Sequence, residues 1–200
     1  MPKLVNHDER RIQIAEAVLR VVAREGVRGV TIRDIAAEAD WSIGVITHYF
    51  DDKQALLVAA LAQATARVRA RMEEASVITD PKKRICALLE AGMPLDPART
   101  ATCRIFFYFW AEGAVDKAVR AELARSYVWW RLAVRKAIEA ARSEGLFPAL
   151  SADALTETLV GVAEGLGVQG MFDAKAMPPE HLRIRLRQMV GHLAGEATSQ

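Results

Sequence analysis

The sequence is poor in the residues that mark disulfide-rich, β-rich and membrane-spanning proteins. Its 200 residues include two cysteines, 12 glycines and 7 prolines, and aromatic residues make up 6% of the chain. The cysteines, Cys86 and Cys103, give no disulfide framework and suit a reducing compartment. No apolar run is long enough to span a bilayer, and the N-terminal stretch lacks a signal-peptide core. We therefore expect a cytoplasmic protein with no membrane partner.

The sequence also lacks a strong excess of charge of either sign. Lysine and arginine number 27 and aspartate and glutamate 25, so the formal net charge is +2. Bulk electrostatic attraction to nucleic acid is therefore not expected, and a prediction of DNA binding has to rest on a motif.

Apolar and helix-forming residues are abundant, and hydrophobic residues make up 52% of the chain. Apolar residues recur at helical spacing and no strand pattern is found, which predicts an all-α fold of about nine helices. The first apolar stripe runs from Ile12 to Val22, and Gly26 is predicted to end that helix. The charge run Arg67, Arg69 and Arg71 is typical of a solvated helix face. The residues predicted to open later helices are Asp51 or Asp52, Asp80, Asp96, Asp116 and Ser151.

Residues 31–53 are predicted to form two short helices joined by a tight turn. Thr31 and Asp34 have the spacing of an N-terminal capping pair, and Ser42 can cap a second helix. This arrangement is typical of a helix-turn-helix, whose second helix lies in the DNA major groove. The residues of the second helix predicted to point inward are Val45, Ile46 and Tyr49.

This stretch resembles the DNA-binding motif of the TetR family of bacterial transcription regulators, and most closely its BetI-like subset, which is typified by a choline-responsive repressor. The matching residues are Thr31, Ile35, Ala36, Ala39, Gly44, Ile46, His48, Tyr49, Phe50, Lys53 and Leu56. Asp40 departs from the pattern, since the family usually has glycine there. The position is expected to be left-handed, which aspartate tolerates better than most residues. The resemblance implies a DNA-binding domain over residues 1–53 and a helical effector-binding and dimerisation domain over residues 54–200.

Several side chains of the motif are candidates for contact with an operator in double-stranded DNA. The residues best placed to face the groove are Ser42, Ile43, Gly44, Thr47 and His48. Thr47 can bond a base edge or a phosphate, and Gly44 lets the helix approach closely. The resemblance adds Tyr49 and Lys53 as phosphate contacts, and Thr31 and Arg33 are candidates for the same role.

An aromatic-rich cluster in the second half of the chain is the candidate small-molecule site. Its aromatic side chains are Phe106, Phe109, Trp110, Tyr127, Trp129 and Trp130, and the residues predicted to bind the ligand are Phe106, Phe109, Trp110, Tyr127, Trp130, Glu164 and Met171. For each aromatic residue alone, core filling is the simpler interpretation, but the group is typical of a pocket lining. An aromatic box with a carboxylate suits a quaternary amine such as choline. The sequence leaves the effector, the operator and the choice between repressor and activator open.

Residues 165–170 match G-x-G-x-x-G literally, but no strand precedes them and both flanks continue a helical pattern. Close helix packing is therefore the favoured interpretation. The resemblance implies a homodimer in which the last two long helices of each subunit form a four-helix bundle. The residues expected at that interface are Leu159, Val162, Gly165, Leu166, Leu186, Met189 and Val190.

Three functions remain open from the sequence. The first is a homodimeric, ligand-responsive transcriptional regulator that is not an enzyme and needs no cofactor. The second is an enzyme that uses the glycine run for a nucleotide, which a nucleotide-dependent change in melting temperature would reveal. The third is a DNA-binding protein without an effector, which the lack of any sizeable cavity would support. The histidine and cysteine spacings predict no metal site, and a redox role for either cysteine is left open.

Overall fold

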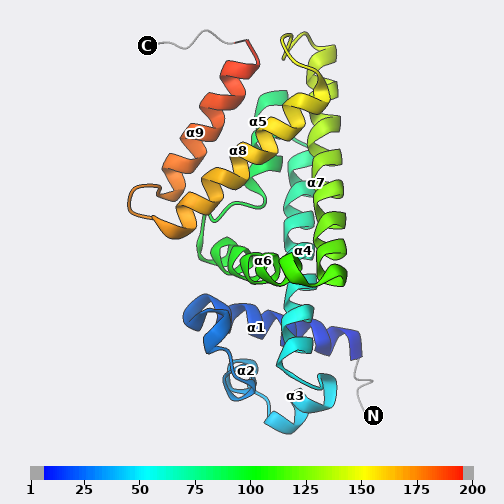
Figure 1. The fold of residues 1–200 in the computed structure, drawn as a ribbon, viewed down its shortest axis with the longest axis vertical. Helices are drawn as coiled ribbons and strands as arrows, with labels where there is room; N and C mark the ends of the chain where they lie inside the picture. Colours follow the sequence, from blue (N-terminus) through cyan, green and yellow to red (C-terminus); the bar gives the residue numbers. More distant parts are fainter. Residues whose placement is uncertain (1–6, 196–200) are drawn as a thin grey trace.

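The computed structural model describes residues 7–195, and within that range the chain forms nine helices and no strand, as predicted. Figure 1 shows a small lower module, formed by the first three helices and the start of the fourth, and a larger upper module, formed by the rest of the described chain. The helices are α1 (His7–Gly29), α2 (Ile32–Ala39), α3 (Ile43–Tyr49), α4 (Lys53–Ser76), α5 (Pro81–Glu90), α6 (Pro97–Val115), α7 (Lys117–Ser143), α8 (Ala152–Phe172) and α9 (Pro179–Leu193).

Local capping chemistry fixes where most of these helices begin. Seven helices start after a side chain that accepts a hydrogen bond from a backbone N–H of the first turn, which satisfies a group that has no partner within the helix. These capping residues are Thr31, Ser42, Asp52, Asp80, Asp96, Asp116 and Ser151. The starts predicted from the sequence are thereby confirmed.

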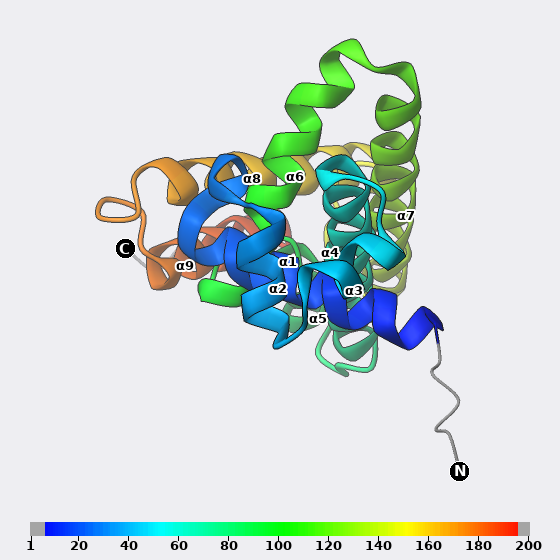
Figure 2. The ribbon, with the colours of Figure 1, turned by 90° about the horizontal axis from the view of Figure 1, so that it is seen from below.

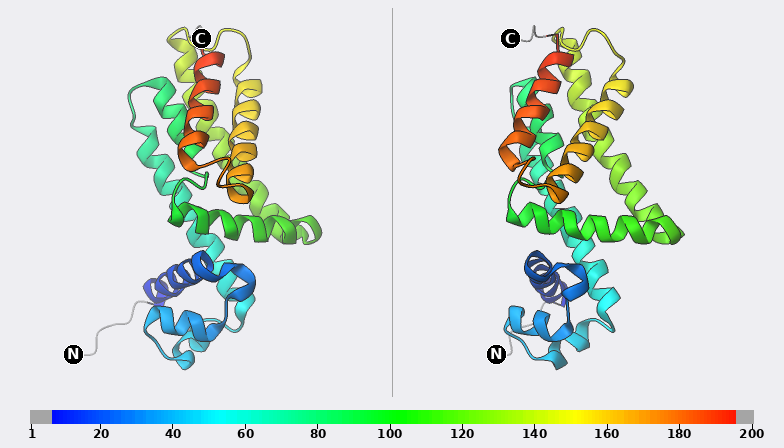
Figure 3. Two further views of the ribbon diagram at one scale, coloured as in Figure 1. Left: turned by 90° about the vertical axis from the view of Figure 1, so that its left-hand side faces the viewer. Right: turned by 60° about the vertical axis from the view of Figure 1, so that its left-hand side comes forward.

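Helix α4 runs from the lower module into the upper one (Figures 1 and 3). Its first half, including Leu56 and Leu61, packs in a core shared with α1, α2 and α3, whereas Met72 and Ala75 pack in the core of the upper helices. The lower core also takes Ile105 from α6. Because α4 belongs to both cores, it connects the two modules. A domain boundary at residue 53 stays a prediction.

Helix α1 is interrupted at Gly26, which has φ 70° and ψ 168°. The predicted helix end there is therefore confirmed as a kink, after which a short turn continues to Gly29. Ile12 was expected in the buried stripe, but its side chain is 51% exposed. It lies in an open groove between α1 and α4, beside Val58. Periodicity identifies an apolar face but not how far the neighbouring helices cover it.

The arginines of α4 are not the solvated face that the sequence predicts. Arg67 pairs with Glu16 of α1, and both side chains are only about one quarter exposed. Arg71 is half-buried and donates to the carbonyl oxygen of Ala91 at 3.2 Å. Only Arg69 of the three is exposed, and its guanidinium lies over the Trp129 ring at 4.9 Å. These side chains join α4 to three neighbouring helices.

No helix within residues 7–195 combines the length and hydropathy needed to cross a membrane. Seen from below, α1, α2 and α3 form the surface at the end of the molecule opposite the upper helices (Figure 2). The short helix α3 lies at the lower extremity in Figure 1, so that its outer face has no protein neighbour from the upper module.

Candidate functional sites

The turn between α2 and α3 sets the position of the predicted recognition helix. Asp40 takes the left-handed conformation with φ 56°, and the N–H of Trp41 donates to the carbonyl of Ala36 at 2.9 Å. Ser42 then caps α3 by accepting from the N–H of Val45 at 3.3 Å. The expected left-handed turn at Asp40 is therefore present. The left-handed conformation costs more free energy for a residue with a Cβ atom than for glycine.

The side chains predicted to read DNA lie together on the outer face of α3. Ser42, Ile43, Gly44, Thr47 and His48 are all exposed. The Thr47 hydroxyl donates to the carbonyl of Ile43 at 3.1 Å, so its oxygen faces outward chiefly as an acceptor. Contact of these residues with DNA stays a prediction.

The predicted phosphate contacts surround this face. Thr31 and Arg33 are exposed at the start of α2. Tyr49 is half-buried, and Lys53 is half-buried and donates to the carbonyl of Arg28 at 3.2 Å. Lys53 thereby caps the end of α1, and it has to leave that carbonyl, or share its remaining protons, to reach a phosphate.

Two features of this surface were missed from the sequence. Val45 was predicted to face inward but is 37% exposed, because α3 is short and presents only Ile46 and the following Phe50 to the core. His7 at the start of α1 lies with its ring 5.1 Å from that of Tyr49 and 6.1 Å from that of His48. No local sequence signal joins His7 to α3, since the contact spans about 40 residues.

Two arginines of α1 stabilise this surface through aromatic rings. The guanidinium of Arg10 lies 4.7 Å from the Trp41 ring centroid, and that of Arg11 lies 4.3 Å from the Phe50 ring centroid. Arg11 also donates to the carbonyl of Tyr49 at 2.6 Å. Both side chains thus hold α1 against the motif.

The upper module contains a mainly apolar cavity of about 100 Å³ between α4, α6, α7 and α8 and the segment that follows α5. Its walls include six aromatic rings and one carboxylate. The lining residues are Thr65, Val68, Gly92, Met93, Pro94, Cys103, Phe106, Phe107, Trp110, Leu123, Ser126, Tyr127, Trp129, Trp130, Ala163, Glu164, Gly167 and Val168.

The cavity contains most of the predicted ligand-binding residues but not all. Phe106, Trp110, Tyr127, Trp130 and Glu164 line it. The burial of Phe109 contradicts its prediction, and Met171 is not part of this lining. Phe109 is 1% exposed and packs in the lower core, and Met171 lies near the end of α8, outside the lining. Trp129 of the predicted aromatic cluster also lines the cavity. The prediction omitted Phe107, because α6 is apolar on nearly every side and its spacing does not mark the cavity face.

Backbone carbonyls at the end of α5 hold two of the lining side chains in place. The Trp130 indole donates to the carbonyl of Leu88 at 3.1 Å, and the Cys103 thiol donates to that of Gly92 at 3.3 Å. Burial raises the pKa of Cys103 to about 12, so the thiol is kept neutral. The arrangement preorganises the aromatic wall.

Glu164 is the carboxylate of this cavity, and its half-buried side chain accepts a hydrogen bond from the Tyr127 hydroxyl. Burial raises the pKa of Glu164 above its ordinary value, while the Tyr127 hydroxyl and the charge of Arg131 act in the opposite direction. Burial and the same carboxylate raise the pKa of Tyr127. A cation in the cavity would favour the ionised form of Glu164.

The glycine run 165–170 lies inside the continuous helix α8, with no strand before it in the described chain. A Cβ atom at Gly161 or Gly165 would meet no atom of the protomer within 4 Å, whereas one at Gly170 would lie 2.7 Å from Leu182. Gly170 therefore permits the close approach of α9, and Gly161 and Gly165 leave an open strip on the outer face of α8.

The predicted dimer residues divide between that outer face and the protomer core. Leu159, Leu186 and Val190 are at most 1% exposed within the protomer, so their assignment to an interface is wrong. Val162 and Leu166 are half-buried, and Gly165 and Met189 are exposed. The exposed Ile184 of α9 was missed. The spacing marked the apolar faces of both helices but did not separate the inner face from the outer one.

Within residues 7–195, no group of histidine, cysteine and acidic side chains is arranged to hold a metal ion.

Comparison with known proteins gives matches over nearly the whole chain. Residues 14–60 match the family described as bacterial regulatory proteins of the tetR family, and residues 81–195 match the C-terminal region of BetI-type transcriptional repressors. The regulator PksA of Bacillus subtilis is 27% identical over 202 residues, which cover 100% of this chain and 97% of PksA. The regulator BetI of Paraburkholderia phytofirmans is 32% identical over 119 residues, which cover 56% of this chain and 58% of that protein.

Solved structures are similar over the same extent. A transcriptional regulator from Saccharomonospora viridis, determined in complex with choline, has a TM-score of 0.82 and 26% identity, covering 92% of this chain and 97% of its own. A TetR-family regulator from Rhodococcus sp. has a TM-score of 0.73 and 25% identity, covering 94% of this chain and 100% of its own.

Proposed function

The chain belongs to the TetR family of bacterial transcriptional regulators, and from this premise we propose that it is a cytoplasmic, ligand-responsive repressor. A homodimer binds a palindromic operator, and a small cation in the cavity of the upper module releases it. The observation that carries the proposal is a preorganised aromatic cavity with one carboxylate, walled by the same helix, α6, that packs on the DNA-binding module.

The outer face of α3 supports the DNA-binding part of the proposal. Ser42, Thr47 and His48 offer polar groups there, and Ile43 offers an apolar contact for a thymine methyl. In a two-fold symmetric dimer the two α3 helices enter successive major grooves about 34 Å apart. With a formal net charge of +2, affinity depends on this geometry and on few phosphate contacts rather than on bulk charge.

The outer faces of α8 and α9 support the dimer. Gly161 and Gly165 leave room for a partner helix to approach α8, and Ile184 and Met189 on α9 are 44% and 37% exposed. Small residues beside exposed apolar ones are what a four-helix interface between two copies needs. Burial of those side chains is the driving force.

The cavity supports a quaternary amine as the effector. The rings of Phe106, Trp110 and Trp130 offer π faces to a cation, and Glu164 supplies the opposite charge. The relative from Saccharomonospora viridis holds choline, which suits the same chemistry. The cavity argues against a regulator without an effector. The position of the glycine run inside a helix argues against a nucleotide-dependent enzyme.

A gel-shift experiment with DNA from around the protein's own gene tests the proposal. We expect the folded dimer to shift a palindromic fragment at physiological salt and choline to reverse the shift, while the neutral isostere 3,3-dimethylbutanol reverses it far less. The variant Thr47→Ala should weaken DNA binding and leave choline binding unchanged. Failure of the folded dimer to bind any palindrome would refute the proposal. Binding that no quaternary amine reverses would refute the effector class.

A further inference from the structure

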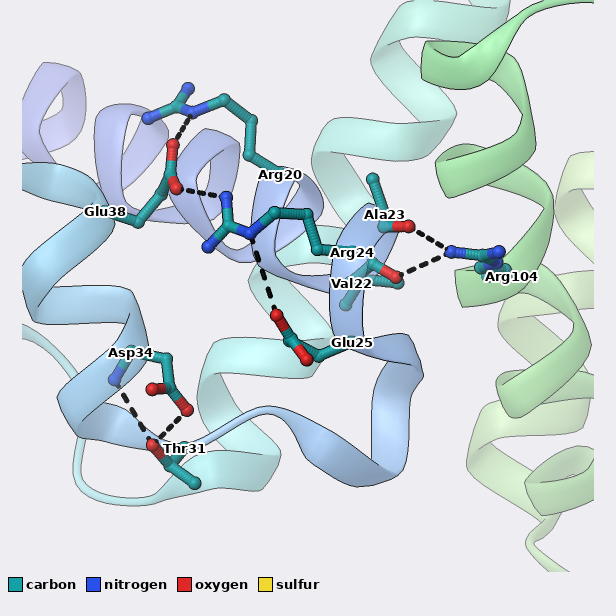
Figure 4. Close-up of polar contacts among 9 residues, drawn as sticks. All are labelled: Arg20, Val22, Ala23, Arg24, Glu25, Thr31, Asp34, Glu38 and Arg104. Carbon is teal, nitrogen blue, oxygen red and sulfur yellow. Dashed lines mark hydrogen bonds and ion pairs between the residues drawn. The ribbon is translucent and has the colours of Figure 1, made fainter.

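Helix α6 has two functional sides. Its side chains Cys103, Phe106 and Phe107 line the cavity, whereas Arg104 is not part of that lining. The Arg104 side chain reaches α1 (Figure 4). The Arg104 guanidinium donates to the carbonyl oxygen of Val22 at 3.1 Å and also to that of Ala23. One residue of α6 is therefore in polar contact with the lower module, next in sequence to a residue of the cavity wall.

The carbonyls that Arg104 binds lie in the last turn of α1 before the kink at Gly26. Carbonyls at a helix end lack helical partners and carry a partial negative charge, so a guanidinium stabilises them strongly. Tyr108 also links α6 to the lower module, by donating to Gln54 of α4 at 3.3 Å. That bond is exposed, long and uncharged, and is expected to be the weaker of the two links.

The same turn of α1 is held on its other side by α2. Arg20 and Arg24 each donate to the carboxylate of Glu38 at 2.5 Å (Figure 4). The hydrogen bond from Arg20, and then that from Arg24, hold the pKa of Glu38 below its ordinary value, so the Glu38 carboxylate stays charged. Because α2 leads through the Asp40 turn into α3, a shift of the end of α1 is carried toward the DNA-reading helix.

We propose that Arg104 transmits ligand binding in the cavity to the DNA-binding module through its hydrogen bonds to α1, and we call this contact the latch. This rests on the proposed function and adds the residue that carries its regulation. A ligand against Phe106 and Phe107 displaces α6, Arg104 moves with it, and the end of α1 shifts together with α2. Arg104 is a positioning residue, since it touches neither the cavity nor the DNA-reading face.

Arg104→Met tests the latch, because methionine keeps an unbranched apolar stem and loses both hydrogen bonds. Arg84→Met is the matched control: Arg84 is also half-buried and donates to two backbone carbonyls, of Ile78 and Thr79, at 2.6 and 3.0 Å, but these lie within the upper module. Choline is the effector probe. Dissociation constants are measured for DNA with and without saturating choline, and for choline without DNA.

In the wild type and in Arg84→Met, we expect choline to weaken DNA binding by a factor in the range of about 5 to 150 that is common for coupled sites. In Arg104→Met the factor should fall to within about twofold of one, with choline affinity unchanged, and Arg104→Lys should recover part of it. Equal responses in Arg104→Met and in the wild type would overturn the latch.

Hydrogen exchange without any effector tests the same link separately from the proposed function. By reciprocity, DNA binding should change exchange in α6 of the wild type. In Arg104→Met this change should disappear while protection of α3 by DNA remains. An α6 that is insensitive to DNA in the wild type, or equally sensitive in the variant, would overturn the latch. A wild type that binds DNA and ignores choline would count only against the effector class.

Discussion

The affinity of the cavity for a quaternary amine should depend on pH through Glu164. Burial raises the pKa of this carboxyl above its ordinary value of 4.5, and the groups that face it are the Tyr127 hydroxyl and the Arg131 guanidinium. The raised pKa of Tyr127 keeps the phenol neutral, so it remains a donor throughout. At a pH below its raised pKa, Glu164 is protonated in the cavity without ligand, and binding of a cation causes it to release that proton.

The size and sign of the effect follow from that single proton. Choline affinity should rise by up to about tenfold per pH unit below the raised pKa of Glu164 and become constant above it, since one pKa unit corresponds to a factor of ten. Calorimetry between pH 4 and 8, a range that begins below the ordinary pKa of 4.5, in two buffers of different ionisation enthalpy, measures both the affinity and the protons released. We expect the release of protons to be largest at the acidic end and to vanish above the raised pKa of Glu164.

The variant Glu164→Gln is the control, because the amide oxygen can still accept from Tyr127 and carries no charge. Its choline affinity should be low and independent of pH, and its proton release should be near zero. A wild type with constant affinity over this range would refute the assignment of Glu164 as the charge that meets the ligand. So would an equal slope in Glu164→Gln.

Three other predictions concern the turn, the interface and the thiol. Asp40→Gly should relieve the left-handed strain and stabilise the protein by about 0.5–1 kcal/mol, or about 1–4 °C in Tm. Ala37→Gly, at a helical position, should instead destabilise it by about 1 kcal/mol. Changes of Tm in the same direction for both variants would contradict the strain at Asp40. Ile184→Glu should give a monomer in light scattering, while Val77→Glu, at a 79% exposed site, should leave the dimer intact. Cys103, with its pKa raised to about 12, should react slowly with a disulfide reagent at pH 8, and more slowly still with choline bound; fast labelling of the folded protein would contradict its burial.

Features governed by neighbouring residues could be predicted from the sequence. Thr31 and Ser42 cap helices because their hydroxyls bond the first turn, and Asp40 takes the left-handed conformation that the tight turn requires. Both effects depend on a few consecutive residues. The resemblance to a known family supplied the rest of the architecture, including the expectation of a separate effector module.

Features governed by the packing of distant helices could not be predicted. Leu159 and Ile184 are both apolar residues of the last two helices, yet the first is buried in the protomer and the second is exposed. Periodicity shows that a helix has an apolar face, but a helix that packs on its own protomer and also meets a partner has two such faces. The sequence does not say which is which. His7 beside Tyr49 is the same problem at the DNA-reading end, where a contact depends on how α1 crosses α3.

The error at Phe109 has a physical origin that bears on regulation. Phe109 and Ile105 of α6 pack in the lower core, while Phe106, Phe107 and Trp110 form a wall of the cavity. A helix with a core on one side and a cavity on the other needs apolar residues almost all round, so its spacing cannot mark either face. That same property places the cavity and the DNA-binding module on opposite sides of one helix. The loss of a readable pattern in α6 is therefore what we expect of a helix in the proposed coupling role.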